Sequence, residues 1–215
     1  MISCPTDRKG RQVPAVIEGI RIVRWEGAYF PAEDTVLILK SIGDGNGNFL
    51  DVGTGTGIVG ICAALKGYAV VSTDIDMDCL QAAAENAEAN GAAVCFVRCD
   101  LAGALRGPFD IIAFNPPYLP EEGLPDRQLT GGERGFELAL RLLCQARDLL
   151  SEKGRVLIVL SSMSSIGEFA RLAGRDWEIT AAGSVKLNFE TLHLVEARLR
   201  RGREKLLPGA LTDNA

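Results

Sequence analysis

The sequence predicts an α/β fold in which helices cover both faces of a mostly parallel, seven-stranded sheet. From residue 46 onward, short runs rich in β-branched residues alternate with longer segments whose apolar residues recur at helical spacing. This alternation is typical of parallel βαβ units and predicts a three-layer sandwich. A short connection through residues 187–189 separates the last two expected strands, which favours an antiparallel strand at the C-terminal end of the sheet.

The core elements follow from this pattern in chain order. Five strands, each apolar enough to be buried on both faces, are predicted over residues 48–52, 69–73, 94–98, 109–115 and 155–160. Four helices are predicted from 58 to about 67, from Asp76 or Asp78 to Gly91, over 135–150, and from Ser164 or Ser165 to 173. The last two strands are predicted over 177–186 and 192–198.

One domain is expected over residues 1–215, because a chain of 215 residues with 47% hydrophobic content can bury one core. Residues 1–45 form an N-terminal extension with a predicted strand over 19–25 and a predicted helix over 32–41. Glu33 and Asp34 suit the positive end of that helix dipole. Residues 46–200 form the predicted catalytic core, and the arginine-rich residues 201–215 are expected to be a flexible tail.

Composition excludes several classes of protein. No apolar run reaches the roughly 18 residues of a membrane-spanning helix, and the first residues lack a secretion signal, so a cytoplasmic protein without a membrane partner is expected. The six cysteines form no CxxC pair. The closest two, Cys95 and Cys99, would lie about 13 Å apart along a strand, too far to share a metal ion. We therefore predict no metal site.

A glycine-rich turn follows the first core strand. Asp51, Gly53, Gly55 and Gly57 stand where that strand ends and a helix begins. Glycines let the backbone turn tightly and approach a ligand, and the switch point of an open α/β sheet provides a crevice for it. This turn is compatible with any nucleotide-like cofactor, and also with a purely structural role.

Acidic residues after the next two strands narrow the choice. Asp74 ends the second strand, where a carboxylate can accept hydrogen bonds from both hydroxyls of a ribose. Asp76 competes for this role but is the better helix N-cap. Asp100 and Leu101 follow the third strand, where they could bind the exocyclic amine and the ring of adenine. The alternative is that these aspartates only form turns.

The fourth strand ends in Asn115-Pro116-Pro117-Tyr118. Consecutive prolines immobilise the backbone and remove two amide donors, so the Asn115 side-chain oxygen and the Pro116 carbonyl can both accept hydrogen bonds. A target NH₂ group that donates to both is fixed in orientation, and Tyr118 can lie against its flat face. This arrangement suits methyl transfer to a planar amide or amine nitrogen.

These motifs resemble the HemK family of class I methyltransferases, which have a Rossmann-like fold and methylate glutamine N5 of release factors. The similarity is closer to the short archaeal and eukaryotic branch. It extends over most of residues 28–198 and includes the segment from Tyr29 to Thr35, the glycine-rich turn, Asp74, Asp100-Leu101, the Asn115 tetrapeptide and Gly131-Gly132-Glu133-Arg134-Gly135. The resemblance lapses in the acidic loop 120–126.

The resemblance implies S-adenosylmethionine as cofactor and a peptide chain release factor as substrate. It implies that Asn115 and Pro116 hold the glutamine amide, and Tyr118 is the third catalytic candidate, from the tetrapeptide itself. It also implies that the N-terminal extension closes over the cofactor, with Thr35, and Asp34 as a further candidate, at its methionine part. The other implied cofactor contacts are Asp51, Gly53, Asp74, Asp100 and Leu101, and we add Gly55 and Asn115 as candidates. A small zinc-binding activator protein is an implied partner, expected at residues 94–97 and the segment before Phe109.

Two other functions remain open. The same tetrapeptide could hold a flipped adenine or guanine in a nucleic-acid N-methyltransferase, but a net charge of −5 and 6% aromatic residues weigh against nucleic acid. A noncatalytic cofactor-binding subunit is disfavoured by the intact Asn115-Pro116 pair. His193 is the only histidine and is expected to be structural.

Overall fold

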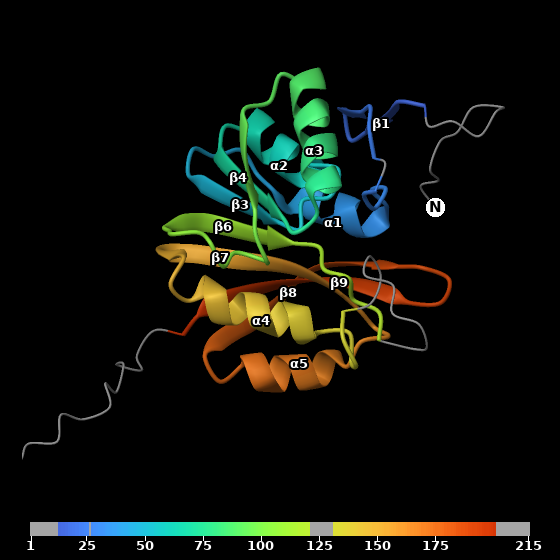
Figure 1. Ribbon diagram of the computed structural model, residues 1–215. Helices are drawn as coiled ribbons and strands as arrows, with labels where there is room; N and C mark the ends of the chain where they lie inside the picture. Colours follow the sequence, from blue (N-terminus) through green and yellow to red (C-terminus); the bar gives the residue numbers. More distant parts are fainter. Residues whose placement is uncertain (1–12, 26, 121–130, 201–215) are drawn as a thin grey trace, which may run out of the picture.

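The computed structural model describes residues 13–25, 27–120 and 131–200, and their central feature is a seven-stranded sheet (Figure 1). Its strand order is β5-β4-β3-β6-β7-β9-β8. The strands are β3 (Asn48–Val52), β4 (Ala69–Asp74), β5 (Val94–Arg98), β6 (Phe109–Phe114), β7 (Leu150–Ser161), β8 (Trp177–Lys186) and β9 (Thr191–Leu199). All neighbouring pairs from β5 to β7 are parallel, and β9 runs antiparallel to both β7 and β8. This arrangement confirms the predicted fold class.

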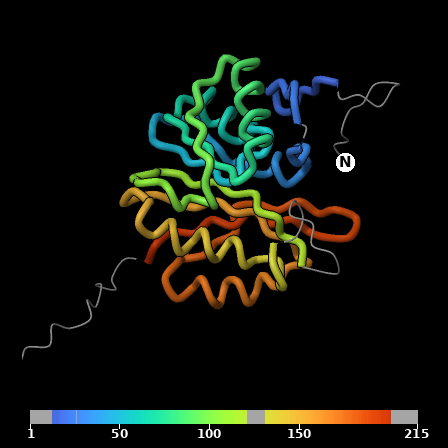
Figure 2. Tube along the Cα trace, in the orientation of Figure 1, coloured from blue at the N-terminus to red at the C-terminus, as the bar shows by residue number. Residues whose placement is uncertain are grey.

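Helices cover both faces of the sheet, as Figures 1 and 2 show. One face carries α1 (Glu33–Ser41), α2 (Ile58–Leu65) and α3 (Met77–Ala89), and the other carries α4 (Glu137–Ala146) and α5 (Ile166–Ala173). Successive strand residues point to opposite faces, so Phe49 packs in the first core and Leu50 in the second, both fully buried. Strand hydrophobicity on both faces therefore builds two cores rather than one.

The strand order places a crevice at one edge of the sheet. From β3 the chain proceeds through β4 to β5 on one side and then crosses to β6 on the other. The carboxyl ends of β3 and β6 therefore diverge into connections on opposite faces. This is the switch point at which open α/β sheets bind their ligands.

The second half of the fold corrects one predicted helix. Helical spacing predicted a helix over 135–150, whereas α4 ends at Ala146 and β7 already begins at Leu150. The Phe109 amide donates to the Leu149 carbonyl at 2.7 Å, and Phe109 pairs with Leu150 in the sheet. Contacts with β6 thus keep Leu149 and Leu150 out of the helix. As a result β7 begins at Leu150 and is longer than the predicted strand over 155–160.

The N-terminal extension also differs from its prediction. Instead of one strand over 19–25, a hairpin joins β1 (Ala15–Ile17) to β2 (Ile20–Ile22). Glu18 and Gly19 both have positive φ, 47° and 81°, as the tightest hairpin turns require. The Glu18-Gly19 dipeptide was the available signal for this turn.

Two further predictions concern the edges of the described chain. β5 is an edge strand with half-exposed and exposed residues, so the expectation that it is buried on both faces is wrong. The predicted tail at 201–215 and most of the 120–126 loop lie outside the described residues. No helix within the described ranges is both long and apolar enough to cross a membrane.

Candidate active site

A cavity of about 760 Å³ opens at the carboxyl edge of the sheet, a volume within the usual range for small-molecule sites. It lies at the ends of β3, β4 and β6 and is bordered by the start of α1. Every residue that the sequence singled out as catalytic or cofactor-binding lines it: Thr35, Asp51, Gly53, Gly55, Asp74, Asp100, Leu101, Asn115, Pro116 and Tyr118.

The glycine-rich turn between β3 and α2 forms the floor of this cavity. Gly53, Gly55 and Gly57 have φ values of +63°, +52° and +84°, a region that side chains with a Cβ rarely adopt. A Cβ at Gly57 would lie 2.8 Å from the Ala83 Cβ, so this glycine lets α2 approach α3. A Cβ at Gly55 would meet no atom within 4 Å, so the space beside the Gly55 Cα is open.

Asp51 is a buried carboxylate beneath the turn. Its Oδ2 accepts hydrogen bonds from Thr54 Oγ1 at 2.5 Å, the Gly60 amide at 3.0 Å and Ser72 Oγ at 3.5 Å. Burial raises the pKa of Asp51 to about 7, although the bonds from Thr54 and Gly60 oppose that rise. Asp51 therefore changes its charge near neutral pH.

This raised pKa predicts a pH-dependent stability. A carboxyl with an ordinary pKa of about 3.9 when unfolded and about 7 when folded binds more protons in the folded chain between those values. The free energy of unfolding should therefore fall as pH rises from about 4 to 7, by roughly 4 kcal/mol at most. Urea unfolding of wild type and Asp51→Asn across this range checks it. A similar slope in both proteins would contradict this role of Asp51.

The structure separates the two competing aspartates after β4. Both aspartates line the cavity, but their hydrogen bonds differ, because Asp74 Oδ2 accepts from the amide of Gly55 in the glycine-rich turn at 3.0 Å. Asp76 is the N-cap of α3, where its side chain accepts from the Asp78 amide at 2.9 Å. The N-cap prediction for Asp76 is confirmed, and Asp74 remains the candidate for the ribose.

Asp100 and Leu101 border the opposite end of the cavity. Leu101 has a positive φ of 51°, and its carbonyl accepts a hydrogen bond from Thr73 Oγ1 at 2.8 Å. Asp100 is about half exposed and forms an ion pair with Arg141 of α4 at 2.5 Å. The sequence did not single out Arg141, which also lines the cavity.

A polar network ties the tetrapeptide to the first turn of α1. Asn115 Nδ2 donates to Thr35 Oγ1 at 3.5 Å, and Thr35 Oγ1 in turn donates to Asp34 Oδ1 at 3.2 Å. Asp34 is only 2% exposed and also accepts from the Tyr118 hydroxyl at 3.2 Å. Burial and the nearby Asp34 raise the pKa of Tyr118, so this phenol stays protonated as a donor.

The other end of the Asn115 side chain has no partner. Asn115 Oδ1 is the only side-chain oxygen or nitrogen among the described residues that is buried without a hydrogen bond. An unsatisfied buried acceptor costs about 1 to 3 kcal/mol and needs an explanation. Because Nδ2 is held by Thr35, Oδ1 is the acceptor that remains for a ligand in the cavity.

The segment before α4 supports the tetrapeptide from behind. A Cβ at Gly131 would lie 2.2 Å from the Pro117 carbonyl oxygen, and one at Gly135 would lie 2.3 Å from the Tyr118 carbonyl oxygen. Ser164 Oγ donates to the same Tyr118 carbonyl. Ser165 is the N-cap of α5 without a side-chain cap hydrogen bond, so neither predicted serine caps the helix through its hydroxyl. Sequence reasoning missed the supporting role of Ser164.

Gly131→Ala should therefore displace the tetrapeptide. The added methyl group would have to push the Pro117 carbonyl away, and such overpacking costs about 1 to 3 kcal/mol. We expect lower stability in urea unfolding and a lower kcat. Gly167→Ala in α5 is the matched control, because a Cβ there meets nothing within 4 Å and alanine favours a helix. Equal stability changes in the two variants would contradict the close-contact argument.

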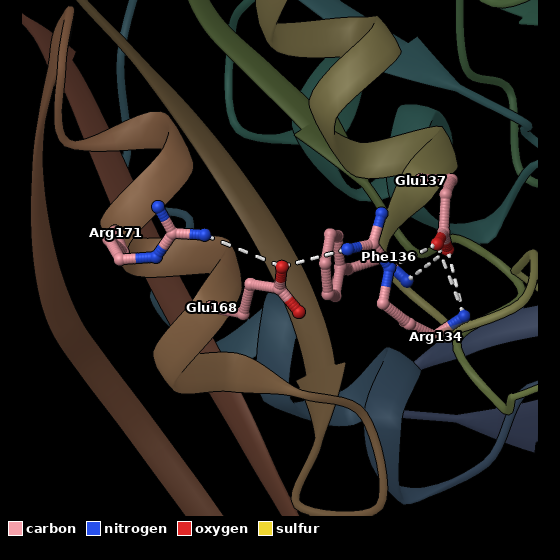
Figure 3. A network of polar contacts seen from close by, with 5 residues as sticks. All are labelled: Arg134, Phe136, Glu137, Glu168 and Arg171. Carbon is pink, nitrogen blue, oxygen red and sulfur yellow. Dashed lines mark hydrogen bonds and ion pairs between the residues drawn. The ribbon is translucent and has the colours of Figure 1, made fainter.

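Figure 3 shows how this supporting segment is anchored. Arg134 forms ion pairs with Glu137 at 3.0 Å and with Glu168 of α5 at 2.8 Å, and its guanidinium lies 4.8 Å from the Phe136 ring centroid. Arg171 contacts the same Glu168 at 3.5 Å. These contacts join the start of α4 to α5 and restrain the segment that abuts the tetrapeptide.

The described residues contain no group of three His, Cys, Asp or Glu side chains suited to a metal ion. His193 pairs with Leu160 and Ser184 inside the sheet and does not line the cavity.

Comparisons with known proteins fit this geometry. Residues 33–173 match the model of the methyltransferase small domain family. A Methanocaldococcus jannaschii protein, provisionally described as a protein N5-glutamine methyltransferase, is 35% identical over 84% of this chain and 96% of its own length. A Deinococcus radiodurans release factor glutamine methyltransferase is 36% identical over 60% of this chain, which spans about half of that longer protein.

A solved structure shows the same fold. The E. cuniculi Mtq2–Trm112 complex, described as responsible for methylation of the eRF1 translation termination factor, aligns with a TM-score of 0.64 and 24% identity. The alignment covers 80% of this chain and 99% of that chain. With the family match and the M. jannaschii relative, the chain therefore belongs to the methyltransferase small domain family, as a HemK-type S-adenosylmethionine-dependent N-methyltransferase.

Proposed function

We propose that this chain methylates the side-chain amide nitrogen of a glutamine in a peptide chain release factor. The observation that carries the proposal is the buried, unpartnered Asn115 Oδ1 in a cavity large enough for a cofactor. Together with the Pro116 carbonyl, this oxygen offers a glutamine amide acceptors for both of its N–H groups. The M. jannaschii and D. radiodurans relatives support glutamine as the target.

The residues of the cavity fit S-adenosylmethionine. Its adenosine would lie between Asp74, which suits the ribose, and Asp100 with Leu101, which suit the adenine. The turn from Gly53 to Gly55 would receive the methionine part, next to Asp51 and Thr35. A buried carboxylate such as Asp51 suits the positive ammonium group of this cofactor. When bound, the cofactor supplies an electrophilic methyl carbon on a positively charged sulfur.

The protein acts on the glutamine by holding it. Asn115 Oδ1 and the Pro116 carbonyl would accept hydrogen bonds from the two N–H groups of the glutamine. These bonds fix the orientation of the amide plane and raise the electron density on the nitrogen, which is the nucleophile. Correct orientation of this kind can supply roughly 7 to 11 kcal/mol of a barrier. As the bond from nitrogen to the methyl carbon forms, the bond from that carbon to the sulfur would break, the sulfur would leave as a neutral thioether, and the nitrogen would lose one proton to water. Tyr118 cannot take that proton as a phenolate, because its raised pKa keeps the hydroxyl protonated.

The charge of the cavity favours a protein substrate over the nucleic-acid alternative. Six carboxylates line it among the described residues, from Asp34, Asp51, Asp74, Asp76, Asp100 and Glu190, against one guanidinium from Arg141. A nucleic acid brings a phosphate at every nucleotide, and its binding depends on lysine and arginine contacts. The acidic residues of the cavity would repel these phosphates, whereas they do not repel a neutral glutamine side chain.

Incubating the chain with S-adenosylmethionine and the release factor of its own organism tests the function. The expected product is a release factor peptide that is heavier by one methyl group, with the mass located on a glutamine by fragmentation. Total RNA from the same organism is the second arm. Methylated RNA together with an unmodified release factor would reject the proposal in favour of the nucleic-acid alternative.

A small zinc-binding activator is proposed as a partner at the exposed edge of β5. That edge strand presents Cys95 to solvent, and among the described residues it pairs in the sheet with β4 alone. The Mtq2–Trm112 complex provides a precedent for a partnered methyltransferase of this fold. Co-expression with candidate activators, followed by size-exclusion chromatography and the methylation assay, tests it. If the chain alone methylates the release factor as fast as the chain co-expressed with an activator, this partner is not needed.

A further inference from the structure

The turn between β8 and β9 presents a phenylalanine to solvent next to the candidate active site. Phe189 is 95% exposed, the largest value among the exposed large apolar side chains of the described residues. Because β9 runs antiparallel to β7, this turn lies at the carboxyl edge of the sheet, where the cavity opens. A large aromatic side chain at such a position is available for contact with another molecule.

Backbone hydrogen bonds hold the turn between β8 and β9 in one conformation. The Leu187 amide donates to the Glu190 carbonyl at 2.8 Å, and Lys186 pairs with Thr191 across the hairpin. Leu187 also packs against the first hydrophobic core. The backbone on both sides of Phe189 is therefore ordered, so binding through its ring requires little further ordering of the main chain.

Glu190 connects this turn to the cavity. Its side chain lines both the cavity and a smaller hollow of about 210 Å³ formed by the hairpin and Ser162. Ser161 Oγ donates to the Glu190 carboxylate and accepts from the Met163 amide at 3.0 Å. Met163 is itself 55% exposed. Two exposed apolar residues are thus connected to a carboxylate that lines the cavity, Phe189 as its chain neighbour and Met163 through Ser161, and we refer to Met163, Phe189 and Glu190 as the lip.

We propose that the lip binds the segment of the substrate polypeptide that flanks the target glutamine; this inference rests on the proposed function. A glutamine side chain that reaches Asn115 brings its main chain to the rim of the cavity. An extended chain advances about 3.3 Å per residue, so residues close to the target meet Phe189, the neighbour of Glu190. Phe189 and Met163 bury the flanking side chains, and Glu190 accepts from their N–H groups. Nucleic acid would place its phosphates against that carboxylate.

Phe189→Ala tests the lip with the release factor of the same organism as substrate. We expect KM for the release factor to rise about tenfold, as for a typical interface anchor. The saturating kcat should stay within about twofold and the Kd for S-adenosylmethionine unchanged, because the acceptor atoms are untouched. Phe189→Leu should give an intermediate KM, since it keeps part of the apolar surface.

Leu65→Ala is the matched control. Leu65 is 54% exposed and ends α2, which runs from the cavity to the opposite edge of the sheet. Its KM should equal that of the wild type. An unchanged KM for Phe189→Ala with an active wild type would overturn the lip and leave the proposed function standing. A wild type that methylates no glutamine in the release factor would overturn both.

Discussion

Asn115→Ala is expected to lower kcat by about 10³-fold while S-adenosylmethionine binds within a few-fold of its wild-type Kd. The substitution removes Oδ1, the buried acceptor that we assign to the substrate amide. Orientation contributes roughly 7 to 11 kcal/mol to such reactions, and each 1.36 kcal/mol corresponds to about a tenfold change in rate. Mass spectrometry of the release factor glutamine measures turnover, and calorimetric titration measures cofactor affinity.

The same substitution should not destabilise the free protein. Asn115 Oδ1 has no hydrogen-bond partner, and an unsatisfied buried acceptor costs about 1 to 3 kcal/mol in the folded state. Alanine removes that cost, although it also removes the 3.5 Å bond to Thr35. A free energy of unfolding at or above the wild-type value, with turnover lost, would separate a substrate acceptor from a structural asparagine. Retained turnover would reject the amide clamp.

Local sequence signals predicted the bounds of several strands but not the end of α4. The strands at 48–52, 94–98 and 177–186 have their predicted bounds, because apolar runs between turn residues mark both ends. The end of α4 had no such mark. Leu149 continues the helical spacing, but a hydrogen bond from Phe109, which is distant in the sequence, draws its carbonyl to the sheet. That choice depends on tertiary contacts, which helical spacing does not report.

The sequence could predict those residues of the candidate site that lie at the carboxyl ends of strands. Because parallel strands have their carboxyl ends at one edge, Asp51, Asp74 and Asn115 had to meet there once the strands were placed. The supporting contacts were not predictable in this way. Ser164 reaches the Tyr118 carbonyl from the α5 side of the fold, and Arg141 reaches Asp100 from α4. Neither residue belongs to a motif whose spacing indicates its partner.

Asp34→Asn is expected to lower kcat by about 10²-fold, the second-largest effect that we predict. We propose that Asp34 positions Asn115 through Thr35, because Asp34 Oδ1 accepts from Thr35 Oγ1, and Thr35 Oγ1 accepts from Asn115 Nδ2. An asparagine at position 34 offers one acceptor oxygen where the carboxylate offers two, and it adds an NH₂ group facing the Tyr118 hydroxyl. A neutral amide oxygen is a weaker acceptor than a carboxylate and holds the Thr35 hydroxyl less firmly, so Asn115 is oriented less precisely, and small misplacements cost about 10² in rate.

Two substitutions of Thr35 distinguish an effect on the position of Asn115 from an effect on the stability of the protein. Thr35→Ser keeps the hydroxyl that links Asp34 to Asn115, so its kcat should stay near that of the wild type. Thr35→Val keeps the shape but loses the link, and its kcat should fall to the level of Asp34→Asn. Because both defects interrupt one path, the double variant Asp34→Asn with Thr35→Val should be no slower than either single variant. Rate losses that multiply in the double variant would show that Asp34 acts on the reaction by a route other than Asn115.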